Sequence, residues 1–262
     1  MDHPLLIAST FCFLLGFCYT VYALRAGTYR ASPFNFSAIA CGFLLQTAFL
    51  FERGHALGRC PLTNLFEVFI FLSWSVVLLY LVIGPAYRLS LLGAFTSPLV
   101  FLLQAFALAA PLDSPPFRRA APNPWIELHA AVSVVACGAF ALAGVAGVMY
   151  LAQERQLKTR RLRSIFFHLP PITDLAVANS RLLRTGFGLL TVGLLSGFAV
   201  GKPLDWVKAG SICVWVLYGV MLMAEKRHSV GPRQVALFSV LAFSLMMSML
   251  WGINFISEQR PL

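Results

Sequence analysis

The segment from Trp125 to Lys158, WIELHAAVSVVACGAFALAGVAGVMYLAQERQLK, decides the fold class of this chain. Its apolar run is long enough to cross a bilayer, which requires about 20 residues. One histidine, His129, stands at the entrance of the run, and a basic stretch stands at its exit. An ionisable side chain at the edge of a membrane helix is costly to keep, and it therefore suggests a function.

The composition of the whole chain agrees with this segment. Of the 262 residues, 59% are hydrophobic and only 11% are charged, whereas a soluble domain carries about a quarter charged residues. The first apolar run, 5–24, has no basic stretch before it and no small-residue cleavage site after it. We therefore expect a retained helix there instead of a signal peptide.

The apolar runs predict an all-α bundle of about eight transmembrane helices within a single transmembrane domain, residues 1–262. Turn signals such as Gly84-Pro85 and Gly231-Pro232 separate most of the spans. The predicted spans are 5–24, 35–52, 65–84, 89–110, 127–152, 186–201, 208–224 and 235–256.

The distribution of Lys and Arg predicts the orientation. Thirteen of the 20 lie on the side of the loop 155–184, and seven lie on the side of the two termini. The positive-inside rule therefore places 155–184 in the cytoplasm and both termini outside, in a multi-pass protein of the cytoplasmic (inner) membrane. The residues expected together at the outer face are His3, His55, His129, Trp125, Asp205 and Trp206, with His168 and His228 at the cytoplasmic face.

The region after the basic loop contains an amphipathic segment and a row of regularly spaced glycines. After Pro170-Pro171, apolar and polar residues alternate as far as Arg184, which predicts a short amphipathic helix on the membrane surface. Glycines at positions 193, 197 and 201 have the four-residue spacing that lets another helix approach closely.

Charge and cysteine content exclude several classes of protein. The net charge of +10 has no soluble basic domain to carry it, so we expect contact with anionic lipid and not with nucleic acid. Five of the six cysteines lie in apolar runs, and no CxxC or CxxCH motif is present. The chain is therefore neither a disulfide scaffold nor itself a c-type cytochrome.

His129 is the first candidate for chemistry. It follows Trp125 by four residues, so imidazole and indole share one helix face, an arrangement that suits a flat aromatic ligand whose metal takes a nitrogen donor. The alternative is an interfacial histidine bonded to a carbonyl, with Trp125 as an aromatic anchor. Asn123 and Pro124 fit the N-cap and first turn of that helix whether or not a ligand binds.

Two further motifs have a structural and a functional interpretation. Asn64 and Glu67 have the spacing of a capping box, and Glu67 could also meet a cationic partner such as Arg59 or a loop arginine. Asp205 and Trp206 form either an interfacial anchor or a platform for a porphyrin face.

No nucleotide loop, activated nucleophile or catalytic carboxylate pair occurs, so we expect a protein that is not an enzyme. Transport is the weakest alternative, because only Gln46 and Gln104 are sizeable polar residues inside the spans.

Long stretches of the chain resemble a known family, the membrane haem-handling proteins of cytochrome c assembly of the CcsA/ResC/CcmC type, and most closely its HemX-like branch. The similar stretches are CPLTNLFEVFIFLSW from Cys60, the segment Trp125 to Lys158, the segment Leu169 to Gly197 and the segment Trp215 to Phe255. The resemblance implies a haem-handling membrane protein that assists biogenesis of c-type cytochromes. Its implied partners are haem, other cytochrome c assembly proteins and apocytochrome.

The resemblance also implies roles for individual residues. His129 stands where the family has its helix-entrance histidine, so it would ligate haem iron. Asp205 and Trp206 stand in place of the family's tryptophan-rich loop WGxxWxWD, which here reads GKPLDWVK. Haem-exporting members have a further histidine after the position of GINF, where this sequence reads ISEQRPL. The second axial ligand would therefore be His55, His3 or a partner's side chain.

The HemX-like branch leaves a second function open. Such a protein would act as a membrane regulator or scaffold for an enzyme of haem biosynthesis, through the basic loop 155–184.

Overall fold

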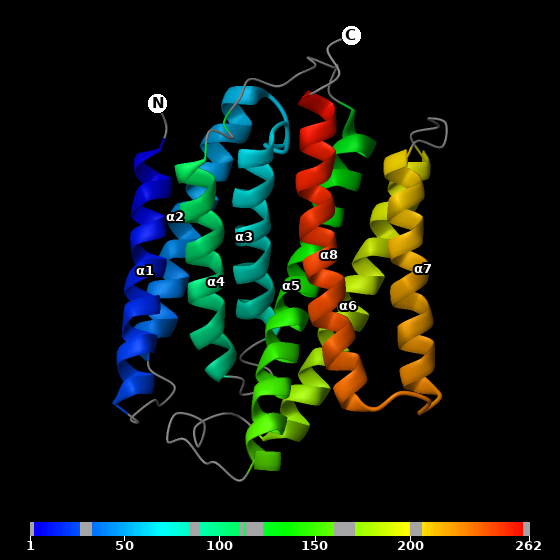
Figure 1. Ribbon diagram of the computed structural model, residues 1–262. Helices are drawn as coiled ribbons and strands as arrows, with labels where there is room; N and C mark the ends of the chain where they lie inside the picture. Colours follow the sequence, from blue (N-terminus) through cyan, green and yellow to red (C-terminus); the bar gives the residue numbers. More distant parts are fainter. Residues whose placement is uncertain are drawn as a thin grey trace.

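The computed structural model of this chain is a bundle of α-helices (Figure 1). The structure describes residues 3–26, 33–83, 90–110, 113, 123–159, 171–199 and 206–258. Within these residues every regular element is helical. The helices are α1 (Pro4–Arg25), α2 (Pro33–Leu57), α3 (Leu65–Ile83), α4 (Ser90–Ala109), α5 (Pro124–Thr159), α6 (Ile172–Ala199), α7 (Trp206–Lys226) and α8 (Pro232–Glu258).

These helices confirm the predicted polytopic bundle. Each of the eight predicted spans falls on one helix. Six helices have the length and apolar content needed to cross a membrane within the described residues, namely α1, α2, α3, α5, α6 and α7, and α4 and α8 contribute shorter apolar stretches. The chain is therefore a multi-pass membrane protein.

Successive helices run in opposite directions, so α1 begins and α8 ends at the same end of the bundle (Figure 1). We call this the termini end; it also holds the end of α2 and the starts of α3 and α5. We call the other end the basic end, because Arg25, Lys158, Lys226 and Arg233 lie in the helix turns there. His3, His55 and His129 thus share one end, as predicted, and His228 lies at the other, while His168 lies outside the described residues.

The central helix is α5, which packs against α3, α4, α6 and α8. Its contact with α6 depends on glycine. A Cβ on Gly186 would lie 2.5 Å from the ring of Phe140, one on Gly193 would lie 2.8 Å from Ser133 Oγ, and one on Gly197 would lie 2.7 Å from His129 Nδ1. The predicted close approach is therefore confirmed for Gly193 and Gly197, while Gly201 lies outside the described residues.

The first half of α6 differs from the expectation of a separate helix on the membrane surface. Residues 172–184 continue without a break into the apolar part of α6. Leu175, Leu182 and Leu183 are buried in the main core, and Asn179 Oδ1 accepts a hydrogen bond of 2.8 Å from Ser239 of α8. The amphipathic pattern arose because this segment packs its apolar stripe against neighbouring helices and not against lipid.

The buried glutamines of the spans join helices in the first half of the chain. Gln46 Nε2 donates to Ser73 Oγ (2.6 Å) and to the carbonyl of Ile70 (2.8 Å), and Thr10 Oγ1 donates to Gln104 Oε1 (2.8 Å). Such bonds between α1, α2, α3 and α4 hold helices together where lipid offers no hydrogen-bond partner.

Candidate functional site

The start of α5 places His129 at the termini end. Asn123 Oδ1 accepts a hydrogen bond of 3.0 Å from the backbone N–H of Trp125, and the carbonyl of Asn123 accepts from Ile126 and Glu127. Pro124, the first helical residue, has no N–H that needs a partner. The predicted N-cap is confirmed, and it fixes where the helix begins.

His129 packs against the end of α6 and is half-buried there. Its Nδ1 lies 2.6 Å from the carbonyl oxygen of Gly193. A carbonyl oxygen only accepts, so Nδ1 carries the proton in this hydrogen bond, and the imidazole tautomer with its proton on Nδ1 has a lone pair on Nε2. Histidines that bind metals have this arrangement, with one nitrogen donating to a carbonyl while the other faces the metal.

Trp125 lies one turn before His129 on α5. Its side chain is 53% exposed, so the indole lies on the outside of the bundle beside the half-buried imidazole. The spacing of four residues puts both rings on one face of the helix. This face therefore offers an aromatic surface next to a single nitrogen donor.

His55 lies at the same end but on a different surface. It is in the last turn of α2 and is exposed. Its ring lies parallel to that of Phe51, with centroids 6.4 Å apart. No interaction between His55 and His129 occurs among the residues that the structure describes, so the fold alone does not make the two imidazoles a pair.

His3 belongs to a polar group that we call the Arg53 cluster, which consists of His3, Arg53, Asn64, Glu67 and Asp113. Arg53 Nε donates to Glu67 (2.9 Å) and its Nη2 donates to Asp113 (2.6 Å). Asp113 also accepts from Asn64 (3.0 Å) and lies 4.0 Å from His3 Nε2. The cluster thus ties α1, α2 and α3 to the segment before α5.

The capping box at the start of α3 is confirmed with one change. Asn64 Oδ1 accepts from the backbone N–H of Glu67 (2.9 Å). The carboxylate of Glu67, however, accepts from the backbone N–H and the hydroxyl of Thr63 (2.7 and 2.8 Å). Arg53, at the end of α2, is a cationic partner of Glu67, so the expected pair of Glu67 with a loop arginine is present.

Cys60 connects this loop to α5. Its backbone N–H donates to Glu127 Oε2 at 3.3 Å. Burial, and then the nearby carboxylates of Glu127 and Glu67, raise the pKa of the Cys60 thiol above its usual range. The thiol is therefore a weak nucleophile at neutral pH.

The positions of Asp205 and Trp206 relative to His129 and the Arg53 cluster are not given by the structure. Asp205 lies outside the described residues. Trp206 is the first residue of α7 at the termini end, and its side chain also lies outside what the structure describes.

The donor set suits a haem iron better than a bare metal ion. Among the described residues, no three His, Cys, Asp or Glu side chains gather into a metal site, whereas an axial haem position needs only one imidazole. The free Nε2 of His129 and the exposed indole of Trp125 fit that requirement. The structure provides one imidazole, that of His129, whose orientation is fixed by a hydrogen bond.

The chain matches the sequence profile of the family described as "Cytochrome C assembly protein" over residues 62–259. It is 33% identical over 181 residues to an uncharacterized 28.8 kDa protein of Azospirillum brasilense, covering 66% of each chain. It is 24% identical to the cytochrome c biogenesis protein CcsA of Chlamydomonas reinhardtii, over 82% of this chain and 64% of that protein. It therefore spans about two thirds of the length of these two relatives.

A third relative represents the other branch expected from the sequence. The chain is 27% identical to Protein HemX of Brevibacillus brevis over 237 residues, which cover 87% of this chain and 85% of that protein. The family profile covers α3 to α8, including α5 and its contact with α6. This chain belongs to the cytochrome c assembly protein family.

Proposed function

We propose that this protein binds haem at its termini end, with Nε2 of His129 as an axial ligand, and passes it on during biogenesis of c-type cytochromes. The observation that carries the proposal is the hydrogen bond from His129 Nδ1 to Gly193, which orients the ring and leaves Nε2 free. Haem brings an iron whose axial position accepts an imidazole nitrogen. Membership in the family supports the same role.

Several residues of this chain would contribute to holding haem. Gly193 and Gly197 let α6 approach His129 closely enough to fix the imidazole. The exposed indole of Trp125 supplies a flat apolar surface for the porphyrin. Asp205 and Trp206 would add a second surface, as the family resemblance implies. In this proposal the chain itself binds and delivers haem. A partner that carries the apocytochrome would perform the covalent attachment of haem.

One fixed imidazole suits a carrier that must also release its ligand. The second axial position would go to His55 or to a group of the partner, since Nε2 of His3 lies 4.0 Å from the carboxylate of Asp113 in the Arg53 cluster. His55 is exposed and carries no salt bridge or hydrogen bond from its ring among the described residues. His55→Ala therefore distinguishes the two sources: it changes the spectrum of the bound haem only if His55 is the second ligand.

The direct test is haem titration of the purified protein in mild detergent, followed by the Soret band. His129→Asn is the sharpest variant, because the asparagine amide can replace Nδ1 as a donor to Gly193 while Nε2 is lost. His228→Asn is the matched control at the basic end, where φ of 55° is a conformation that asparagine tolerates. We expect haem binding to be lost in His129→Asn and kept in His228→Asn; an unchanged Soret band in His129→Asn would refute the ligand role.

The HemX-like alternative is a regulator or scaffold for an enzyme of haem biosynthesis. The observation in its favour is the length of α5, whose 36 residues extend about 54 Å and exceed a hydrocarbon core of about 30 Å. Its last turns, with Arg155 and Lys158, therefore project from the basic end. A photo-crosslinker at Arg155 that captures a soluble haem-biosynthesis enzyme would favour this role, and one that captures only lipid would count against it.

A further inference from the structure

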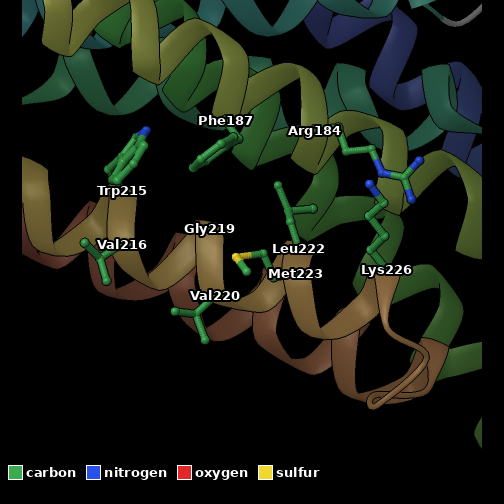
Figure 2. Close-up of a pocket in the computed structure, with 9 residues that line it drawn as sticks. All are labelled: Arg184, Phe187, Trp215, Val216, Gly219, Val220, Leu222, Met223 and Lys226. Carbon is green, nitrogen blue, oxygen red and sulfur yellow. The ribbon is translucent and has the colours of Figure 1, made fainter.

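We propose that a groove between α6 and α7 at the basic end binds one anionic phospholipid from the surrounding leaflet. The groove has a volume of about 650 Å³ and is lined along its length by Phe187, Trp215, Leu222 and Met223 (Figure 2). It adjoins a more polar cavity of about 550 Å³, which includes Arg181 and His228. Arg184 and Lys226 line both spaces, so an apolar channel leads into a cationic mouth.

The wall of the groove suits an acyl chain. The rings of Phe187 and Trp215 are stacked with centroids 5.4 Å apart, and the indole N–H already donates to Thr191 (2.8 Å). Gly219 has no side chain where it faces Phe187, which deepens the groove. The occupant therefore meets mainly carbon and sulfur along this part of the wall.

The mouth of the groove suits a phosphate. The side chains of Arg184 and Lys226 approach one another from α6 and α7 (Figure 2). Glu225 is the acidic residue there: it lies 3.6 Å from Arg184 Nη2 and accepts a hydrogen bond from Ser180. Among the described residues that line the two spaces, Arg184 and Lys226 already outnumber the single carboxylate of Glu225, so the mouth keeps a net positive charge that an anionic head group would balance.

The length of the groove matches one leaflet. Trp215 and Lys226 are eleven residues apart on α7, which corresponds to about 16 Å along the helix axis. Half of a hydrocarbon core of about 30 Å is about 15 Å. With Lys226 at the membrane edge, a lipid whose phosphate pairs with it would bring its chain as far as Trp215.

The exposure of α7 argues for lipid as the occupant. Only 6% of the residues in its apolar stretch Ala209–Lys226 are buried within the chain, and its main contact is with α6. An apolar helix of a partner protein would cover the groove but leave the cations of the mouth without a counter-charge. An anionic phospholipid would fill the apolar groove with an acyl chain and would also balance the cations of the mouth at the basic end.

The test uses quenching of Trp215 by brominated acyl chains. The full chain is reconstituted in bilayers of phosphatidylcholine with a minor fraction of phosphatidylglycerol, and the bromines are placed on one lipid or the other at equal mole fraction. The signal of Trp215 is isolated by comparison with Trp215→Phe. We expect brominated phosphatidylglycerol to quench Trp215 more strongly than brominated phosphatidylcholine.

Matched variants test which cations cause the preference for phosphatidylglycerol. Lys226→Gln should lower the preference for phosphatidylglycerol about fivefold, the effect of one cation near an anionic surface, and Arg184→Gln should act in the same direction. Arg227→Gln removes the same charge from the next residue, which lines neither cavity, and should leave the preference intact. If a variant fails to fold, salt provides the second measurement, because screening should weaken the preference of the unmodified protein.

Three results would overturn the proposal. Equal quenching by the two lipids would remove the anionic preference. A preference that survives in both Lys226→Gln and Arg184→Gln would place the lipid elsewhere. Loss of haem binding, followed by the Soret band, in both Lys226→Gln and Arg184→Gln would make the groove a haem site instead. The first two results do not depend on His129.

Discussion

The Nδ1 atom of His129 lies 2.6 Å from the carbonyl oxygen of Gly193, across the contact between α5 and α6. The same oxygen accepts a hydrogen bond of 2.7 Å from Ser196. A Cβ at position 193 would meet Ser133 and a Cβ at position 197 would meet the imidazole, so these two glycines let α6 lie close enough to α5 for His129 to reach this carbonyl. The geometry of the proposed ligand is therefore set by helix packing, and changes in that packing should alter it.

Gly197→Ala should disturb the imidazole without touching the proposed ligand itself. The new Cβ would lie 2.7 Å from His129 Nδ1, so the ring must turn or the two helices must separate. We expect weaker haem binding and a loss of about 1–3 kcal/mol in the free energy of unfolding, as for other overpacked contacts. Haem titration and thermal unfolding measure the two effects.

The matched control for this change is Gly188→Ala on the same helix. A Cβ at Gly188 meets nothing within 4 Å, so we expect unchanged haem binding and equal or slightly greater stability, since alanine favours helix more than glycine does. Equal behaviour of the two variants would show that the α5–α6 contact does not control the site.

Glu67→Gln should be strongly destabilising. Glu67 is 1% exposed and its partner Arg53 is 19% exposed, so the change leaves a largely buried cation with one carboxylate fewer. Breaking a buried pair costs about 3–5 kcal/mol, and we expect the lower part of that range because Asp113 still pairs with Arg53. Lys158→Gln is the control, since its pair with Glu154 involves a side chain 62% exposed and should contribute about 0–1 kcal/mol. Similar unfolding midpoints for both variants would contradict this view of the cluster.

Cys60 should react slowly with alkylating reagents at neutral pH. Burial and two carboxylates raise its thiol pKa, and only the thiolate is nucleophilic. The rate should therefore keep rising with pH above the range where a free thiol levels off. Glu127→Gln removes one negative charge while an amide oxygen can still accept from the Cys60 backbone, so it should lower the pKa and speed alkylation. A rate in Glu127→Gln that equals that of the unmodified chain at every pH would rule out the electrostatic contribution.

Sequence reasoning succeeded where the signal was local. Apolar runs located the helices, and Asn123 and Asn64 marked helix starts because a cap acts within a few residues. An arginine partner for Glu67 was expected, but the rest of the Arg53 cluster was missed, since Asp113 and His3 meet Arg53 and its neighbours only after distant segments have packed. The early turns of α6 looked like a surface helix because a stripe facing lipid and a stripe facing protein have the same period.

For the site residues, too, local features could be predicted from the sequence, and contacts between distant residues could not. The position of His129 at the membrane edge followed from the sequence, and its hydrogen bond to Gly193 did not, because that contact joins residues 64 positions apart. His55 was placed correctly at the termini end, but the sequence could not show which side of α2 its ring would occupy. Its role as a second ligand stays a prediction.

The Lys and Arg distribution predicts that the termini end lies outside the cytoplasm, and delivery of haem on that side depends on this orientation. With Cys60→Ser as background, the other natural cysteines lie within helices, so an introduced cysteine reports on its own end of the bundle. Ala56→Cys is at the termini end and Arg227→Cys is at the basic end, both at exposed positions. Because positive loops stay inside, a membrane-impermeant maleimide should label the first variant on intact cells and the second only after permeabilisation. The opposite pattern would place His129 at the cytoplasmic face and leave the regulator role as the one compatible with the topology.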